Sequence, residues 1–233
     1  MRFQDAAPDA RAIVYAGIQA DPLVARAAAL LADAGPAQRV LARAVMNGST
    51  TDAATWRTIF PGLFGGGSRP GDERDGDRDR SEAILQASLA VADRGEGARQ
   101  QFRGAIVESL TEVLVRRRPG IAASAVRRER RVLFDGVRAE IHPYDVTVEV
   151  AGRAEALDCK WGARGINADV LHQLDDARSH AADEDETLAV SLVVFDADRS
   201  CAVRLDRETA PHGGTRLVSL ERLDDLAVDG ARS

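Results

Sequence analysis

The sequence predicts an α/β protein in which a mixed β-sheet is flanked by helices and preceded by an all-α extension. Three observations support this fold class. Residues 8–60 are rich in alanine and carry apolar side chains at helical spacing. Residues 131–152 alternate β-branched with polar side chains, which is typical of half-buried strands. Residues 187–195 (TLAVSLVVF) form a continuous apolar run, which is typical of a strand buried on both faces.

Turn residues delimit the N-terminal helices. The apolar segments are interrupted at Asp21-Pro22, Gly35-Pro36 and Asn47-Gly48. Proline is favoured in the first turn of a helix, and glycine or asparagine often follows the last turn. These interruptions predict three or four short helices, and we expect a helical domain over residues 1–61.

The next segment has a different composition. Residues 62–81 combine glycine with charges of both signs and contain almost nothing to bury, which predicts a flexible linker. We therefore expect a second domain over residues 82–233. It begins with a helix over 82–93 and a longer helix over 97–118, which ends at a Pro-Gly pair.

The order of the later elements predicts the sheet. Alternating residues on either side of Asp135-Gly136 predict two strands, and residues 153–161 predict a third. Residues 166–182 have helical spacing, and Asn167 is a suitable N-cap. A strand meander, a crossover helix and a buried strand together form a mixed sheet. Weaker patterns predict further strands over 200–205 and 215–219 and a short helix over 220–228.

The composition excludes several classes of protein. A formal charge of −6 is not the basic excess that is usual in nucleic-acid-binding proteins, so such binding must use local positive charge. No run approaches ~18 apolar residues and the N-terminus lacks a secretory signal, so we expect no membrane span. Cys159 and Cys201 are too few for a disulfide framework or a four-thiolate zinc site, and the histidines lack zinc-binding spacing. We expect a cytoplasmic protein.

One residue stands out from this composition. Of the 31 Lys and Arg residues, only Lys160 is a lysine. Alternate side chains of a strand share a face, so Asp158 and Lys160 project together while Leu157, Cys159 and Trp161 pack on the other side. With 37 acidic residues among 233, an aspartate two residues before a lysine also arises readily by chance. On its own the pair is equally well explained as an ion pair on a partly exposed strand.

The preceding strand supplies a second carboxylate. Asp145 and Glu149 share one face of that strand, and a turn at 151–153 joins it to the strand of Lys160. If the two strands are neighbours, Asp145 and Asp158 meet on one surface beside the lysine. Glu149 is either a further ligand or a solvated strand residue.

Two carboxylates and an ammonium group define a specific chemistry. Carboxylates with a main-chain carbonyl and waters form an oxygen shell suited to Mg²⁺ or Mn²⁺. Such an ion polarises a phosphoryl oxygen and activates water. A lysine can orient or deprotonate that water, because desolvation can lower its pKa, whereas a guanidinium stays protonated.

The sequence Tyr144-Asp145-Val146, followed after 12 residues by Asp158-Cys159-Lys160, resembles the motif of the PD-(D/E)xK nuclease superfamily. The resemblance covers residues 97–196 and includes the order of the elements. It implies a restriction-endonuclease-like fold. It also implies that Asp145, Asp158 and the main-chain carbonyl of Cys159 bind Mg²⁺ or Mn²⁺, and that Lys160 is the catalytic base or positions the water.

The same resemblance suggests two further site residues. In that superfamily a glutamate on the helix before the sheet often contributes as a catalytic residue and metal ligand, and Glu108 occupies that place. Glu112 is the alternative ligand. A further alternative is that Glu108 is simply exposed to solvent. A glutamine on the helix after the lysine strand contributes in some members, and Gln173 is placed accordingly. Two departures are the absence of a literal Pro-Asp pair and the presence of Ala177 where one branch has tyrosine.

The chain has a net negative charge, so a polyanionic substrate must bind to a local group of basic residues, and several lie near the predicted strands. Four arginines are candidates for phosphate contacts, namely Arg127, Arg128, Arg131 and Arg164. The alternative is that they form a solvated basic surface. Arginines 116–118 are placed similarly. Binding depends on local rather than net charge.

The resemblance implies an endonuclease that cuts DNA in preference to RNA, with a role in antiviral defence or restriction by analogy. It further implies a homodimer as the acting form. We expect the N-terminal helices to bind a protein partner or a second copy. The alternative is a catalytically inactive nuclease-like module that binds DNA or a protein.

Overall fold

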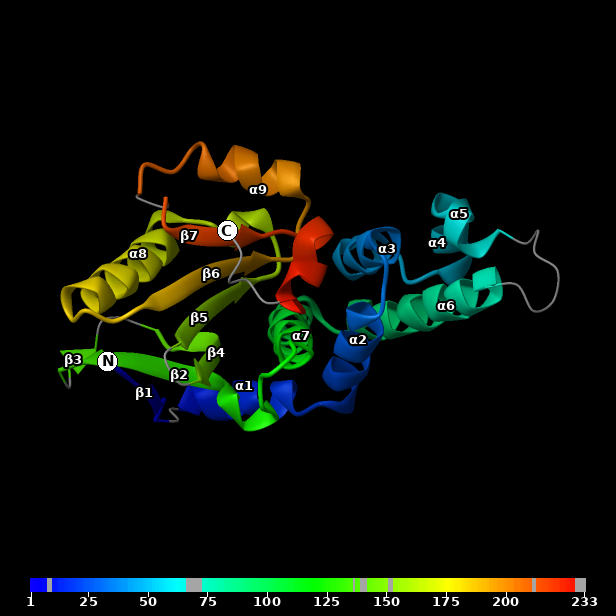
Figure 1. Cartoon of the computed structure of the whole chain (residues 1–233). Coiled ribbons are helices and arrows are strands. Elements are labelled where there is room, and N and C mark those ends of the chain that lie inside the picture. The colour runs from blue at the N-terminus through cyan, green and yellow to red at the C-terminus, as the bar shows by residue number, and fades with distance from the viewer. Residues whose placement is uncertain are drawn as a thin grey trace. The chain divides into compact units, whose positions relative to one another are not determined.

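The computed structural model describes residues 1–7, 10–65, 73–135, 137–138, 142–150, 153–210 and 213–228. The chain forms two compact units, which are described separately. Residues 12–110 form a helical unit, and residues 1–11 together with 111–233 form a sheet unit. Figure 1 labels their elements.

The helical unit contains the short N-terminal helices that the sequence predicts. Its helices are α1 (Ala10–Gln19), α2 (Pro22–Ala32), α3 (Pro36–Asn47), α4 (Ala53–Ile59), α5 (Pro61–Phe64) and α6 (Glu73–Ala92), followed by α7 (Glu96–Arg116), whose last turns belong to the sheet unit. The predicted helix starts are confirmed: proline occupies the first turn of α2 and α3, and the Asp21 side chain accepts from the Leu23 N–H at 2.8 Å.

The predicted linker over 62–81 is too long, and the boundary at 82 is misplaced. Helix α6 begins at Glu73, and residues 66–72 lie outside the described residues. The buried side chain of Gln38 explains the extra turns, because its amide donates to the carbonyl of Asp77 and to the hydroxyl of Ser81, both at 3.0 Å. Helix α6 packs against α2 and α3, so it belongs with the N-terminal helices rather than with the sheet.

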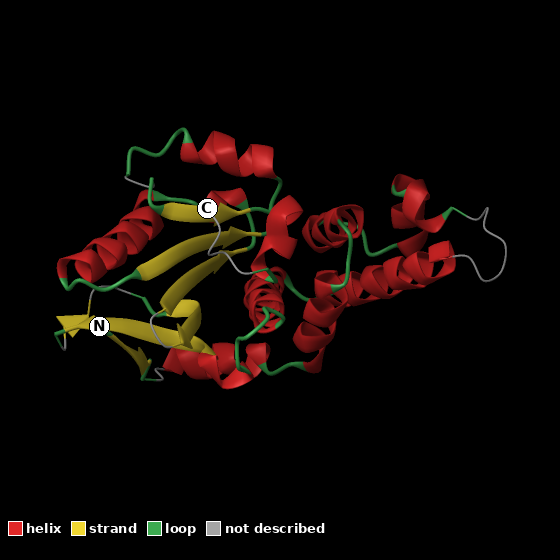
Figure 2. Cartoon of the chain, in the orientation of Figure 1, coloured by secondary structure: helices red, strands yellow, loops and turns green. Residues whose placement is uncertain are grey.

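The sheet unit contains one mixed sheet, drawn as yellow arrows in Figure 2. Its strands are β1 (Arg2–Asp5), β2 (Val126–Phe134), β3 (Val137–Arg138), β4 (Tyr144–Val150), β5 (Arg153–Lys160), β6 (Leu188–Val194) and β7 (Thr215–Val218). The strand order is β1-β2-β4-β5-β6-β7, with β3 paired to β2. The β5–β6 and β6–β7 pairs are parallel and the other pairs are antiparallel. The predicted meander and mixed sheet are therefore confirmed.

Helices cover both faces of this sheet. Helix α8 (Ala168–Asp183) connects β5 to β6 as predicted, with the Asn167 side chain capping its start at 3.0 Å. Its apolar face joins a core with β2, β5 and β6 and with Cys201 of α9 (Asp198–Leu205). On the opposite face, Thr111 of α7 contacts Cys159, and Arg118 reaches the carbonyl of Leu226 in the 3₁₀ helix η3 (Leu220–Leu226).

One predicted strand is absent from the described residues, and one observed strand was not predicted. Residues 200–205 lie in α9 rather than in a strand, and Cys201 is the buried residue of that helix. A short helix can cover a sheet by burying one side chain, whereas the sequence pattern alone suggested alternation. Strand β1 was not predicted, because its four residues contain a single apolar side chain, Phe3. In the described part of the chain, no helix is both long and apolar enough to cross a membrane.

Candidate active site

The start of β4 and the ends of β5 and β6 meet at one end of the sheet, which we call the Lys160 end. The register of the antiparallel β4–β5 pair matches Val146 with Leu157, so one step further along Asp145 lies opposite Asp158. Strand β6 runs parallel to β5, and the residues that follow it reach the same end. The fold therefore brings the two predicted carboxylates together with the predicted lysine.

Asp145 is held against strand β5. Its Oδ2 accepts a hydrogen bond from the Cys159 N–H at 2.6 Å. A main-chain donor to a carboxylate is a strong, charge-assisted hydrogen bond. It fixes the Asp145 side chain beside the residue that separates Asp158 from Lys160.

Asp158 and Lys160 form a close ion pair. The Lys160 Nζ lies 2.5 Å from Asp158 Oδ2, and the two side chains are 27% and 10% exposed. That oxygen is shielded from solvent, and its contact is the Lys160 ammonium group. A buried carboxylate needs a cation beside it, which here is Lys160, and Asp145 adds a second negative charge near the same lysine.

The charge state of Lys160 differs from the expectation for a base. Burial lowers the pKa of Lys160, but the negative charges of Asp158 and Asp145 outweigh burial and raise the pKa above its ordinary value. The sequence predicted a lysine whose pKa desolvation lowers. In this arrangement Lys160 is instead a stable cation at neutral pH, which fits a group that positions water and balances charge.

The loop after β5 shapes the surroundings of Lys160. This loop contains the 3₁₀ helix η2 (Ala163–Gly165). A Cβ atom at Gly165 would lie 2.9 Å from Cβ, Cγ and Cδ of Lys160. The absence of a side chain at Gly165 is therefore required by the close approach of the lysine stem.

Asp196 holds this loop in place, and the sequence did not single it out. Its buried carboxylate accepts from the Ala163 N–H at 2.9 Å and from the Ala197 N–H at 2.8 Å. Asp196 directly follows the apolar run of β6. An acidic residue at the carboxyl end of a buried parallel strand is a recognisable signal, because polar site residues collect at such ends.

Gln173 lies close to this end of the sheet, but its amide has main-chain partners. Its Oε1 accepts from the His142 N–H at 3.4 Å, and its Nε2 donates to the His142 carbonyl at 3.3 Å. Its own carbonyl accepts from the Tyr144 hydroxyl at 3.3 Å. These contacts attach α8 to the segment that leads into β4, so Gln173 supports the strand that carries Asp145.

Glu108 lies in the helical unit, whereas the other predicted site residues lie in the sheet unit. Its Oε1 accepts from the Tyr15 hydroxyl at 2.5 Å and its Oε2 accepts from Gln19 Nε2 at 2.7 Å. It is a buried carboxylate with neutral donors on both oxygens. Its participation in the site stays a prediction, as does that of the Cys159 carbonyl.

The two alternative carboxylates are paired with arginines. Glu112 contacts Arg116 at 2.6 Å and also contacts Arg128. Glu149 contacts Arg130 at 2.8 Å and lies near the last residue of β4, away from Asp145. Most of β4 separates Glu149 from Asp145, so Glu149 does not lie beside Asp145 as a second ligand.

The four candidate arginines have different settings. Arg127 is exposed and lies 3.9 Å from Asp5, and Arg128 is partly buried against Glu112. Arg131 is half-buried on β2 opposite Gln4, and Arg164 is exposed in η2. Arg118 has no such exposure, because it is buried and bonded to Glu155 at 2.7 Å, so it is not a phosphate contact.

The donor set at the Lys160 end fits a hard cation only in part. Among the described residues, no three Asp, Glu, His or Cys side chains are grouped as a metal site. Two carboxylates, Asp145 and Asp158, are present. Mg²⁺ keeps several waters and often uses one or two carboxylates together with substrate phosphates, so a pair is sufficient for such an ion.

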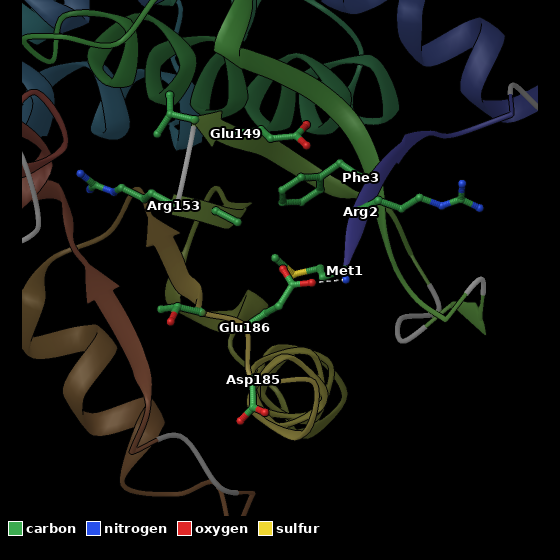
Figure 3. A pocket seen from close by; sticks show the side chains of 10 residues that line it. Met1, Arg2, Phe3, Glu149, Arg153, Asp185 and Glu186 are labelled. Atoms are coloured by element: carbon green, nitrogen blue, oxygen red, sulfur yellow. Dashed lines mark hydrogen bonds and ion pairs between the residues drawn. The ribbon is translucent and has the colours of Figure 1, made fainter.

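The opposite end of β5, which we call the Arg153 end, contains a pocket of about 350 Å³ (Figure 3). Glu149, Arg153 and Glu186 contribute to its lining. Glu149 is paired with Arg130, and Glu186 with the Met1 α-ammonium group. Glu149 and Glu186 therefore each have a cation of their own.

Comparisons with known proteins add little to this description. No protein-family model matches the chain, and no curated protein matches its sequence. The chain is similar to a solved structure, the crystal structure of protein VC1899 from Vibrio cholerae, with 18% sequence identity and a TM-score of 0.41. The match covers 97% of this chain and 56% of that protein, so the chain spans little more than half its length. At this level the likeness identifies no family or activity.

Proposed function

We propose that this chain is a divalent-metal-dependent nuclease of the PD-(D/E)xK type, with a restriction-endonuclease-like sheet, that hydrolyses phosphodiester bonds in DNA. One observation carries the proposal. Two carboxylates from neighbouring strands, Asp145 and Asp158, lie beside a single protonated lysine, Lys160. Two negative charges around one positive charge leave a local excess that favours a cation.

The residues of this cluster have distinct roles in the proposal. Asp145 and Asp158 would hold Mg²⁺ or Mn²⁺, and the hydrogen bond from Cys159 orients Asp145 before the ion arrives. When bound, such an ion polarises a phosphoryl oxygen and lowers the pKa of a coordinated water. Lys160 orients the attacking water and balances charge on the phosphate, consistent with its raised pKa.

Direct cleavage assays test the proposal. Purified protein is incubated with plasmid DNA, linear DNA and RNA, with and without Mg²⁺ or Mn²⁺, alongside Lys160→Ala. We expect metal-dependent DNA cleavage that Lys160→Ala reduces by at least about 10³-fold. Cleavage that survives Lys160→Ala contradicts the assigned mechanism. Product ends on plasmid and linear substrates distinguish internal cutting from degradation of ends.

A catalytically inactive module that binds DNA or a protein is the second candidate. The internal pairing of the cluster favours it, because Lys160 neutralises Asp158 and the Cys159 N–H already satisfies one oxygen of Asp145. In that case the three residues stabilise the end of the sheet. Absence of cleavage on every substrate, together with a large loss of stability in Lys160→Ala, would favour this candidate.

A further inference from the structure

A second charged feature of the sheet unit involves β2, the strand beside β4. An open groove of about 520 Å³ is bordered by the last turns of α7, the 3₁₀ helix η1 (Ala123–Ala125), the start of β2 and the end of β1. Its polar lining consists of Asp5, Glu112, Arg116, Ser124, Arg127 and Arg128. Three arginines and two carboxylates therefore face one groove.

The position of the groove is set by the sheet register. Arg128 on β2 pairs with Val146 on β4, and Val146 is the residue after Asp145. From the usual strand spacing and rise, the main chain of Arg128 lies about 6 Å from that of Asp145. Paired residues project from the same face, so the Arg128 side chain lies on the face of Val146 and Leu157, and Asp145 projects from the other face.

Glu112 occupies the place between two of the arginines. One of its oxygens contacts Arg116 at 2.6 Å, and the other contacts Arg128. Arg128 uses a single terminal nitrogen for this contact, and its Nε–H has no acceptor among the described residues. The pair therefore lacks the side-on fork in which Nε and a terminal nitrogen both donate to one carboxylate.

The third arginine is held even more weakly. Arg127 lies 3.9 Å from Asp5, and the two side chains are 56% and 72% exposed. Ion pairs with such exposure and distance contribute little, because water and salt screen them. A phosphate group, with more acceptor oxygens than a carboxylate, can replace Asp5 as the partner of Arg127 at small cost.

We propose that this groove, the Arg128 groove, binds the phosphate backbone of a polynucleotide, and that Glu112 takes the place of a phosphate between Arg116 and Arg128 when the groove is empty. The proposal rests on the proposed function only for the choice of a polynucleotide as ligand. Entry of the polynucleotide releases Arg116 and Arg128 from Glu112. Glu112 thus weakens the binding of the polynucleotide, and the arginines provide the favourable contacts.

Binding measured without cleavage tests the groove. The fluorescence anisotropy of a labelled single-stranded and a labelled duplex oligonucleotide is titrated with the full chain in EDTA, at several salt concentrations. We expect Arg128→Ala to weaken binding about fivefold to tenfold and to lower the slope of log Kd against log salt by about one. Glu112→Gln should tighten binding about threefold to tenfold, because it removes a negative charge beside the phosphates.

The chain offers matched controls for both variants. Asp225 lies 3.1 Å from Arg222 and 3.9 Å from Arg216, so it also stands between two arginines, but beside β7 at the other edge of the sheet. Asp225→Asn and Arg222→Ala should leave the affinity within about twofold. Thermal unfolding of each variant verifies that it is folded.

Each outcome decides the proposal. It is overturned if wild-type protein fails to bind at low salt, if Glu112→Gln does not tighten binding, or if the control variants change it equally. Competition by inorganic phosphate or a mononucleotide at concentrations comparable with the oligonucleotide would show a small-anion site instead. Binding that follows the prediction in a protein that cleaves nothing supports the groove and rejects the nuclease, whereas cleavage insensitive to Arg128→Ala and Glu112→Gln rejects the groove alone.

Discussion

Strand β5 carries an ion pair at each end, Arg153 with Glu155 and Lys160 with Asp158. The charges that surround the two pairs are opposite in sign. At the Lys160 end, one lysine has two carboxylate neighbours, Asp158 and Asp145. At the Arg153 end, one carboxylate, Glu155, has two arginine partners, Arg153 and Arg118. Lys160 and Arg153 are equally exposed, at 27% each. The two ends therefore differ in charge and chemistry rather than in burial.

This difference separates a site from a structural contact. At the Arg153 end the buried Arg118 also donates to the Leu226 carbonyl at 2.7 Å, so its donors are engaged within the fold. At the Lys160 end, by contrast, two carboxylates, Asp158 and Asp145, have Lys160 as a common neighbour. An excess of buried carboxylate attracts a cation, whereas a carboxylate between two arginines does not.

The largest expected effect is on cleavage at the Lys160 end. Asp158→Asn and Asp145→Asn keep the size of the side chains but remove the charge that would hold the metal. We expect each to reduce metal-dependent DNA cleavage by at least about 10³-fold. Initial cleavage rates at saturating Mn²⁺ measure the effect.

The control for this prediction comes from the opposite end. Arg153→Ala removes the equally exposed partner of Glu155 and leaves Arg118 in place. Its cleavage rate should remain within about twofold of wild type. Equal losses at both ends would mean that the cluster acts through stability, and the distinction between the ends would fail.

The second effect is on stability at the Arg153 end. Arg118→Met removes a buried cation and leaves Glu155 with Arg153 alone. We expect the free energy of unfolding to fall by about 2–4 kcal/mol, because a buried charge loses its closest partner. Urea denaturation followed by circular dichroism gives this value.

Asp158→Asn is the matched variant at the Lys160 end. It leaves Lys160 with Asp145 as a carboxylate neighbour. Because it also relieves an excess of negative charge, its cost should be smaller than that of Arg118→Met. A greater loss for Asp158→Asn than for Arg118→Met would reverse the assignment of structural and functional ends.

The third effect concerns the position of Lys160. Gly165→Ala places a Cβ atom 2.9 Å from the stem of Lys160, so the lysine or the loop must shift. We expect cleavage to fall about tenfold with a small change in stability, since small displacements of a positioning group are costly for the reaction. Gly213→Ala, where no atom lies within 4 Å of the new Cβ, is the control. A cleavage rate unchanged by Gly165→Ala would contradict a positional role for Lys160.

The elements with strong local patterns were predictable from the sequence. The apolar run of β6, the alternation of β4 and β5 and the cap of α8 all lie where the sequence places them. The meeting of Asp145 with Asp158 followed from a short turn between two alternating strands. Each of these predictions depends on residues close in sequence.

The remaining features depend on contacts between distant residues. The extension of α6 to Glu73 is explained by Gln38, which lies far away in the sequence. The partners of Glu108 and of Gln173 are also distant, and no periodicity reveals them. The charge state of Lys160 was predicted in the wrong direction because it depends on the balance between burial and two carboxylates.

The smallest expected effect is on the pH dependence of stability, where lysine and arginine differ. Burial lowers the pKa of Lys160, but Asp158 and Asp145 outweigh burial and raise it above the ordinary value. A raised pKa in the folded state means that the stabilisation is complete below the unfolded value of about 10.4 and is lost as the pH rises through the folded pKa. The difference in free energy of unfolding between wild type and Lys160→Met, at most about 1 kcal/mol, should therefore be constant from pH ~7 to ~9 and shrink above pH ~10.4. The corresponding difference for Arg153→Met should stay constant across this range, because a guanidinium keeps its proton. A parallel decline for both variants would show that the alkaline loss comes from elsewhere in the chain.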